Sequence, residues 1–170
     1  MIRRTCGVTA GEGVIMDERV LRDQLIAQLE GGQAFLPVVR ILDGFPVAYA
    51  GARMMGIAHT PWELLEHLRI AQWDILSFTL DPKHVTPPWP DEHWPKASSP
   101  GSVDEWTSSV DRFLAELEQV KCLARNPEIP LFEKIPHGSG QTYLREVLLV
   151  AEHNAYHLGQ LLMLRRAFEK

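Results

Sequence analysis

Four stretches of the 170-residue chain repeat apolar residues every three or four positions, and no segment shows the two-residue alternation of a half-buried strand. This period predicts amphipathic helices, which must bury their apolar faces against one another. The predicted helices run from Asp17 to Leu29, from Thr60 to about Leu80, from Ser102 to about Leu123, and from about Thr142 to Phe168, with a further turn or two between Phe35 and Leu42. We therefore expect an all-α fold, a four-helix bundle.

The start of the second helix carries the clearest local signal. Thr60 can cap the helix, Pro61 stands at the first helical position, and Glu63 completes a Thr-x-x-Glu capping box. Ser102 and Glu105 repeat the capping-box pattern at the start of the third helix. Both starts are therefore defined by side chains close in sequence.

A proline-rich segment joins the second and third predicted helices. Residues 81–101 contain six of the twelve prolines, together with Trp89 and Trp94. Tryptophan is rare in disordered linkers. We expect an ordered crossover that Trp89 and Trp94 hold against the surface of the bundle.

Composition and charge exclude several classes of protein. The net charge of -5 offers no basic surface for nucleic acid. No run of about 18 apolar residues is present that would span a membrane, and the first fifteen residues lack the apolar stretch of a signal peptide. We expect a cytoplasmic protein in which residues 17–170 form one domain and residues 1–16 a flexible N-terminal extension.

The two cysteines, Cys6 and Cys122, indicate no disulfide framework and no metal site. Cys6 falls in the N-terminal extension, and Cys122 is expected to be buried in the third helix.

His153 and His157 interrupt an apolar face of the last helix. Residues four apart on a helix lie on one face with Cβ atoms about 5–6 Å apart, and neutral imidazoles at that spacing can bind one metal ion. The alternative is a pair of core histidines that hydrogen-bond to polar neighbours. A second apolar row on the same helix, which includes Leu148 and Leu158, indicates burial on two sides.

A metal needs a third ligand, and His67 is the best-placed candidate. It lies between Leu64 and Ala71 on the edge of the apolar stripe of the second helix. Packing of that helix against the last one would direct His67 toward His153 and His157. The remaining histidines are less suited: His84 and His93 in the crossover and His137 in a loop are expected at the surface, and His59 is at most a neighbour of the ligands.

Three absences narrow the kind of metal site. Asn154 replaces the glutamate of a His-Glu-x-x-His motif, so the general base of that class is missing. No Glu-x-x-His pair occurs, which argues against a dinuclear carboxylate site, and no phosphate loop or nucleophile elbow is present. The remaining hypothesis is a mononuclear site with three histidines, and three imidazoles suit zinc, nickel, copper and iron alike. No catalytic residue is assigned: Glu63, Asp74 and Glu146 are expected to be solvated charges or partners of the histidines.

Two segments, TPWELLEHL at residues 60–68 and HNAYHLGQ at residues 153–160, resemble the DinB family. Trp94-Pro95 and PHGSGQT at residues 136–142 resemble one bacterial branch of it, and the resemblance covers residues 17–166. It implies a bundle of up-down-down-up topology with a long crossover between the second and third helices. It also implies a divalent metal, often nickel or zinc with iron or manganese as alternatives, on His67, His153 and His157, and frequent homodimers.

The resemblance further implies a metal-dependent enzyme of the thiol S-transferase kind. In such an enzyme a metal activates a small thiol as its thiolate, which attacks an electrophilic substrate. A metal-dependent hydrolase is the neighbouring alternative. Two further hypotheses remain. The protein could be a non-enzymatic metal-binding or stress-associated bundle, or a metal-free interaction bundle.

Overall fold

The computed structural model describes residues 17–169, and this part of the chain is helical with no β-strand. The helices are α1 (Glu18–Glu30), α2 (Val38–Leu42), α3 (Pro61–Leu80), α4 (Val103–Arg125) and α5 (Tyr143–Phe168), with short 3-10 helices η1 (Val47–Tyr49) and η2 (Asp91–His93). The predicted all-α class is confirmed. The predicted flexible extension, residues 1–16 with Cys6, lies outside the described residues.

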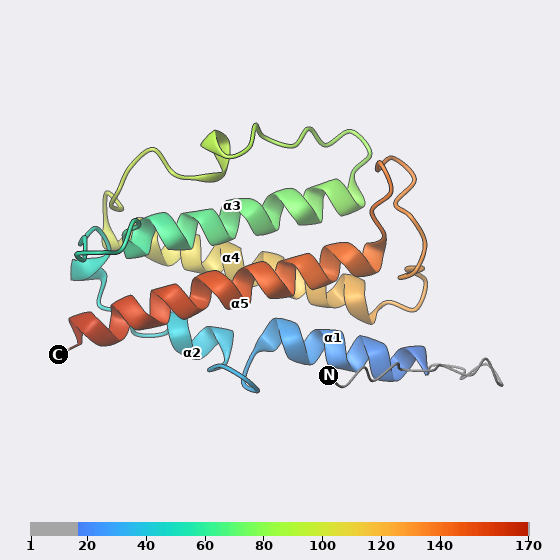
Figure 1. The fold of residues 1–170 in the computed structure, drawn as a ribbon, viewed down its shortest axis with the longest axis horizontal. Helices are drawn as coiled ribbons and strands as arrows, with labels where there is room; N and C mark the ends of the chain where they lie inside the picture. The colour runs from blue at the N-terminus through green and yellow to red at the C-terminus, as the bar shows by residue number, and fades with distance from the viewer. Residues whose placement is uncertain (1–16, 170) are drawn as a thin grey trace, which may run out of the picture.

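The four long helices lie side by side, and the proline-rich crossover follows the outer side of α3 (Figure 1). Helix α3 packs against both α4 and α5, and α1 packs against the same two helices from the other side. None of the described helices is long and apolar enough to cross a bilayer.

The start of α3 forms the predicted capping box. Thr60 Oγ1 accepts a hydrogen bond from the Glu63 backbone N–H at 3.1 Å, and Glu63 Oε2 accepts one from the Thr60 N–H at 2.8 Å. Thr60 Oγ1 also donates to the Ser98 carbonyl at 2.7 Å. The cap therefore fixes both the start of α3 and the end of the crossover.

Only half of the capping box predicted for α4 forms. Ser102 Oγ accepts from the Glu105 N–H, but the Glu105 carboxylate accepts from the N–H of Gly101 and not from that of Ser102. A Cβ atom at Gly101 would lie 3.1 Å from Glu105 Oε2, so the glycine gives this carboxylate more room. The carboxylate bonds one residue further back than a capping box requires.

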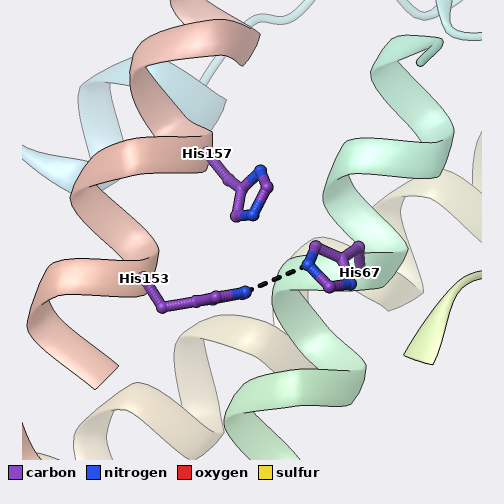
Figure 2. Close-up of side chains that lie close together, drawn as sticks. All are labelled: His67, His153 and His157. Atoms are coloured by element: carbon purple, nitrogen blue, oxygen red, sulfur yellow. Dashed lines mark hydrogen bonds between the residues drawn. The ribbon is translucent and has the colours of Figure 1, made fainter. Parts of the chain in front are cut away.

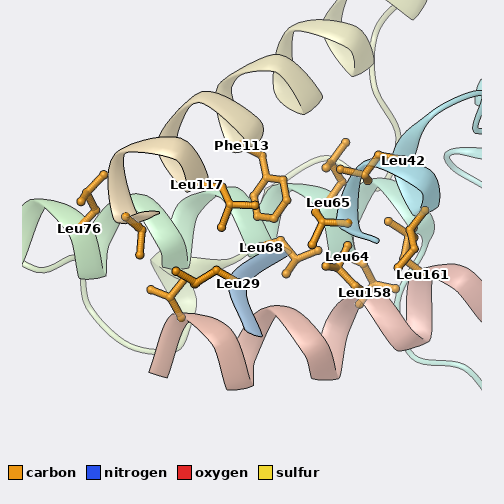
Figure 3. Packing of buried hydrophobic residues seen from close by; sticks show 14 of the residues in the cluster. Leu29, Leu42, Leu64, Leu65, Leu68, Leu76, Phe113, Leu117, Leu158 and Leu161 are labelled. Carbon is orange, nitrogen blue, oxygen red and sulfur yellow. The ribbon is translucent and has the colours of Figure 1, made fainter. Parts of the chain in front are cut away.

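Leucines of α3 form the centre of the hydrophobic core. They pack with apolar side chains from α4 and α5 (Figure 3), and the almost fully buried members include Leu64, Leu65, Leu68, Phe113, Leu158 and Leu161. Burying one such side chain stabilises a fold by about 1.5–3 kcal/mol. This packing sets α3 against α5, so the next positions on the two helices, where the histidines lie, face each other.

Three predictions of burial are wrong or only partly right. Trp94 packs against the core as expected, but Trp89 is 68% exposed. Cys122 is exposed because the inward positions of α4 are taken by Val120 and Leu123 on either side of it. On the second apolar row of α5, Leu158 is fully buried whereas Leu148 is exposed.

Candidate metal centre

The structure brings His67, His153 and His157 together between α3 and α5 (Figure 2). One nitrogen from each ring lies within 4.8 Å of the other two. The nearest pair is His67 Nε2 and His153 Nε2, which are 3.0 Å apart. The two helices predicted to carry the ligands, far apart in sequence, therefore meet at one point in the fold.

Helix geometry explains the meeting. His67 lies two turns after the Thr60 cap of α3, and His153 and His157 lie one turn apart on the facing side of α5. His67 is 1% exposed, whereas His153 and His157 are half-buried. The site is thus closed on the α3 side and accessible on the α5 side.

Hydrogen bonds determine which nitrogen two of the rings present. His67 Nδ1 lies 2.7 Å from the carbonyl oxygen of His93, and a carbonyl only accepts, so Nδ1 carries the proton. His157 Nδ1 donates to Gln160 Oε1 at 3.1 Å. Each neutral ring therefore presents its Nε2 lone pair to the centre, as metal-binding histidines do when an outer partner fixes their tautomer.

His153 supplies the third nitrogen. Its Nδ1 is buried without a hydrogen-bond partner, and its Nε2 faces the His67 Nε2 lone pair. Without a metal, this contact requires His153 to donate through Nε2–H; with one, all three Nε2 lone pairs can face the same ion. Three neutral imidazoles are a donor set that suits divalent zinc or nickel, so the residues present fit the group.

Burial keeps the three rings neutral. It lowers the pKa of His67 to about 4, although the hydrogen bond to His93 acts in the opposite direction. It lowers the pKa of His153 to about 3, with a further contribution from the neighbouring His157 and His67. The pKa of His157 is also lowered, again mainly by burial. At neutral pH the rings therefore hold lone pairs for a metal.

These shifts predict that the metal-free protein loses stability as the pH falls from 6.5 to about 4. In the unfolded chain His67 and His153 take up protons near pH 6.5, whereas the folded state accepts them only near 4 and 3. The unfolded state binds more protons in this window, so the free energy of unfolding decreases as the pH falls. Urea unfolding in the presence of a chelator, at several pH values, measures this dependence.

The matched control for this prediction is His153→Gln, which keeps a polar side chain without a titrating ring. Its free energy of unfolding should depend less steeply on pH than that of the wild type over the same window. Parallel dependences in the two proteins would contradict the shift.

Aromatic rings surround the histidines. Trp94 stacks on His67 with ring centroids 3.8 Å apart, and His59 stacks on Trp94 at 3.9 Å. His59 is therefore separated from His67 by an indole. Tyr156, which is exposed, lies 4.8 Å from the ring of His157. Trp94 closes one face of His67, and Tyr156 stands at the accessible side of the centre.

The expectation that His84 and His93 lie at the surface is wrong. His93 is 4% exposed, and its Nε2 lies 3.3 Å from Asp74 Oδ2; the side chain of His84 is also mostly buried, with Nε2 2.6 Å from Asp74 Oδ1. The reason is the buried carboxylate of Asp74, which both rings satisfy as the crossover passes over α3. Helical periodicity does not predict the path of a crossover. The signal that the sequence does contain is Asp74, an acidic residue two turns after His67 on the same helix. His137 is exposed, as expected.

A buried amide chain next to the centre was also missed. Asn154 Nδ2 donates to Gln72 Oε1 at 2.9 Å, and Gln72 Nε2 donates to the carbonyl of Phe113 at 2.8 Å. This chain links α5, α3 and α4 beside His153. The signal in the sequence was a pair of amides at inward positions of two apolar helices.

The other acidic candidates form bonds elsewhere. Glu63 belongs to the cap of α3 and pairs with Arg53 at 2.9 Å, and Glu146 pairs with Arg145 at 2.7 Å. In residues 17–169, neither carboxylate hydrogen-bonds to His67, His153 or His157. The centre thus consists of imidazoles enclosed by aromatic rings.

Comparison with known proteins agrees with this geometry. The model of the DinB superfamily matches residues 37–161, a span that contains α3, the crossover, α4 and all three histidines. A search of curated proteins found no match. Because the family model covers more than half of the sequence, the chain belongs to the DinB superfamily.

Proposed function

We propose that this protein binds one divalent metal ion, zinc or nickel, through His67, His153 and His157. The observation that carries the proposal is the convergence of three imidazole nitrogens within 4.8 Å of one another, from two segments far apart in the sequence. The hydrogen bonds from Nδ1 of His67 and His157 to His93 and Gln160 support it, because they leave Nε2 free on both rings.

We further propose that the centre serves a thiol S-transferase type of enzyme. Three protein ligands leave one coordination position of a divalent metal open. When bound, such a metal would supply the positive charge that keeps a small thiol at this position deprotonated at neutral pH. The chain itself contributes orientation and shielding. The carbonyl of His93 holds the ring of His67 in place, and Trp94 covers one face of that ring against water. Trp89 and Tyr156, both largely exposed beside the histidines, offer apolar surface for the electrophile.

The proposal also includes the order of the helices in the bundle and the association of two copies. The four long helices form an up-down-down-up bundle, and two copies associate through the outer face of α5. Exposed Leu148 and Met163 on that helix support the homodimer. The cytoplasmic location stays a prediction of the sequence.

Turnover of a thiol with a model electrophile tests the enzymatic part. Zinc- or nickel-loaded protein, purified without an affinity tag, should accelerate thioether formation between cysteine or glutathione and monochlorobimane. The rate should fall to the uncatalysed level after chelation and in His157→Ala, because the open centre is then lost. Fluorescence of the product measures it.

His137→Ala is the matched control, since His137 is an exposed histidine that bonds to the Phe78 carbonyl outside the centre. It should retain the wild-type rate. Loaded protein that turns over no thiol would contradict the transferase and leave a metal-binding protein. Metal-dependent hydrolysis of p-nitrophenyl acetate without any thiol would contradict it in favour of a hydrolase.

A further inference from the structure

We infer that Asp74 is a positioning residue for the metal centre and that it acts on His67 through His93. The inference rests on the proposed metal site, but the geometry that carries it does not include the metal. Among the described residues, Asp74 hydrogen-bonds to His84 and His93 and not to His67, His153 or His157. Asp74 bonds instead to His93, the last residue of η2, whose carbonyl contacts His67.

The connection consists of two bonds. His93 Nε2 lies 3.3 Å from Asp74 Oδ2, and the backbone carbonyl of the same residue lies 2.7 Å from His67 Nδ1. Asp74 and His67 are seven residues apart on α3, which places them on one face, about 10 Å apart along the axis. Helix α3 therefore holds His93 at both ends, by its side chain and by its carbonyl.

Asp74, His93 and His67 are buried, so loss of either bond between them would leave a polar group without a partner. Asp74 is 8% exposed, and His93 and His67 are buried still more deeply. A buried carboxylate is costly unless it is hydrogen-bonded, so Asp74 retains its partners and holds η2 close to α3. The His93 carbonyl is then fixed where it accepts from His67 Nδ1. Displacing η2 would leave His67 free to place its proton on either nitrogen.

The second bond of Asp74 provides an internal control. His84 Nε2 lies 2.6 Å from Asp74 Oδ1, and His84 comes from the first part of the crossover. It anchors the same segment to the same carboxylate but does not lead to His67. If Asp74 merely stabilised the crossover, loss of His84 and loss of His93 would affect the centre alike. If it positions His67, only the His93 connection matters.

The first experiment measures metal binding in the full-length, tag-free protein. Chelator-treated wild type, Asp74→Asn and His84→Gln are titrated with cobalt(II) in competition with a chromophoric chelator, and the visible absorption bands of bound cobalt are recorded. Loss of an outer hydrogen-bond partner costs roughly 10–100-fold in metal affinity. We expect a loss of that size and altered bands in Asp74→Asn, and wild-type bands with affinity within about three-fold in His84→Gln. Wild-type affinity and bands in Asp74→Asn, or an equal loss in both variants, would overturn the inference.

The second experiment needs no metal and separates this inference from the proposed function. Nitrogen-15 NMR of the metal-free protein reports which nitrogen of His67 carries the proton. The wild type and His84→Gln should show Nδ1–H, and Asp74→Asn should show a mixture. An unchanged tautomer in Asp74→Asn would overturn the positioning role even if cobalt binds. Failure of the wild type to bind cobalt would remove the proposed function alone.

Should Asp74→Asn not fold, His93→Ala breaks the same connection from the other side and keeps the carbonyl.

Discussion

Replacing His153 by alanine should lower the affinity for zinc by more than about 100-fold, the upper end of what loss of an outer hydrogen-bond partner costs. His153 is one of three nitrogens that face the centre, so its removal leaves two ligands and a more open coordination sphere. The residue is half-buried on α5, and the fold should therefore tolerate the change. Isothermal titration of chelator-treated, tag-free protein with zinc measures the affinity and the stoichiometry.

The control for this variant is again an exposed histidine. His137→Ala should bind one zinc ion per chain with wild-type affinity, and circular dichroism should show equal helicity in both variants. Equal zinc binding by His153→Ala and the wild type would contradict the ligand set.

Replacing Phe113 by alanine should destabilise the metal-free protein by about 3–5 kcal/mol, the range for deleting a buried aromatic ring. Phe113 is fully buried in the core between α3 and α4, and its carbonyl also accepts the hydrogen bond from Gln72. For a domain of this size, that loss corresponds to a fall in Tm of roughly 6–20 °C. Thermal and urea unfolding followed by circular dichroism measure it.

Phe132 offers the matched comparison, because its ring is exposed in the loop before α5. Phe132→Ala should change the free energy of unfolding by no more than about 0.5 kcal/mol, as for most surface substitutions. A loss below about 1 kcal/mol in Phe113→Ala would show that the core does not depend on this packing.

The helix boundaries could be predicted from the sequence because their signals are local. Thr60, Ser102 and Thr142 each cap the helix that follows with their own side chains. The partial failure at Ser102 lies within the same few residues, because the Glu105 carboxylate bonds to the N–H of Gly101 in place of that of Ser102. Side chains close in sequence therefore predict where a helix begins, but not every bond of its cap.

The meeting of the three histidines could be predicted for a different reason. Periodicity placed His67 at the edge of one apolar stripe and His153 and His157 within another, and two helices that bury their stripes against each other must bring such positions together. The resemblance to the DinB family then implied the same three histidines as the ligands of a divalent metal. Neither argument included the hydrogen bonds of His93 and Gln160 that orient the rings.

The surroundings of Asp74 could not be predicted, because they depend on where the crossover returns to α3. His84 and His93 stand in a proline-rich segment without periodicity, and nothing close to them in sequence indicates a buried carboxylate. The same limit applies to Trp89, which was expected to pack as Trp94 does and is largely exposed. Contacts between distant segments come from the tertiary fold.

Anomalous diffraction from crystals of tag-free protein, collected on both sides of the zinc and nickel absorption edges, would locate a metal bound by the three histidines. We expect one strong anomalous peak on the α5 side of His67, at about 2.0–2.1 Å from a ring nitrogen of each of the three histidines if the ion is zinc. A peak bound to other residues, or none between these rings after soaking with either metal, would contradict it.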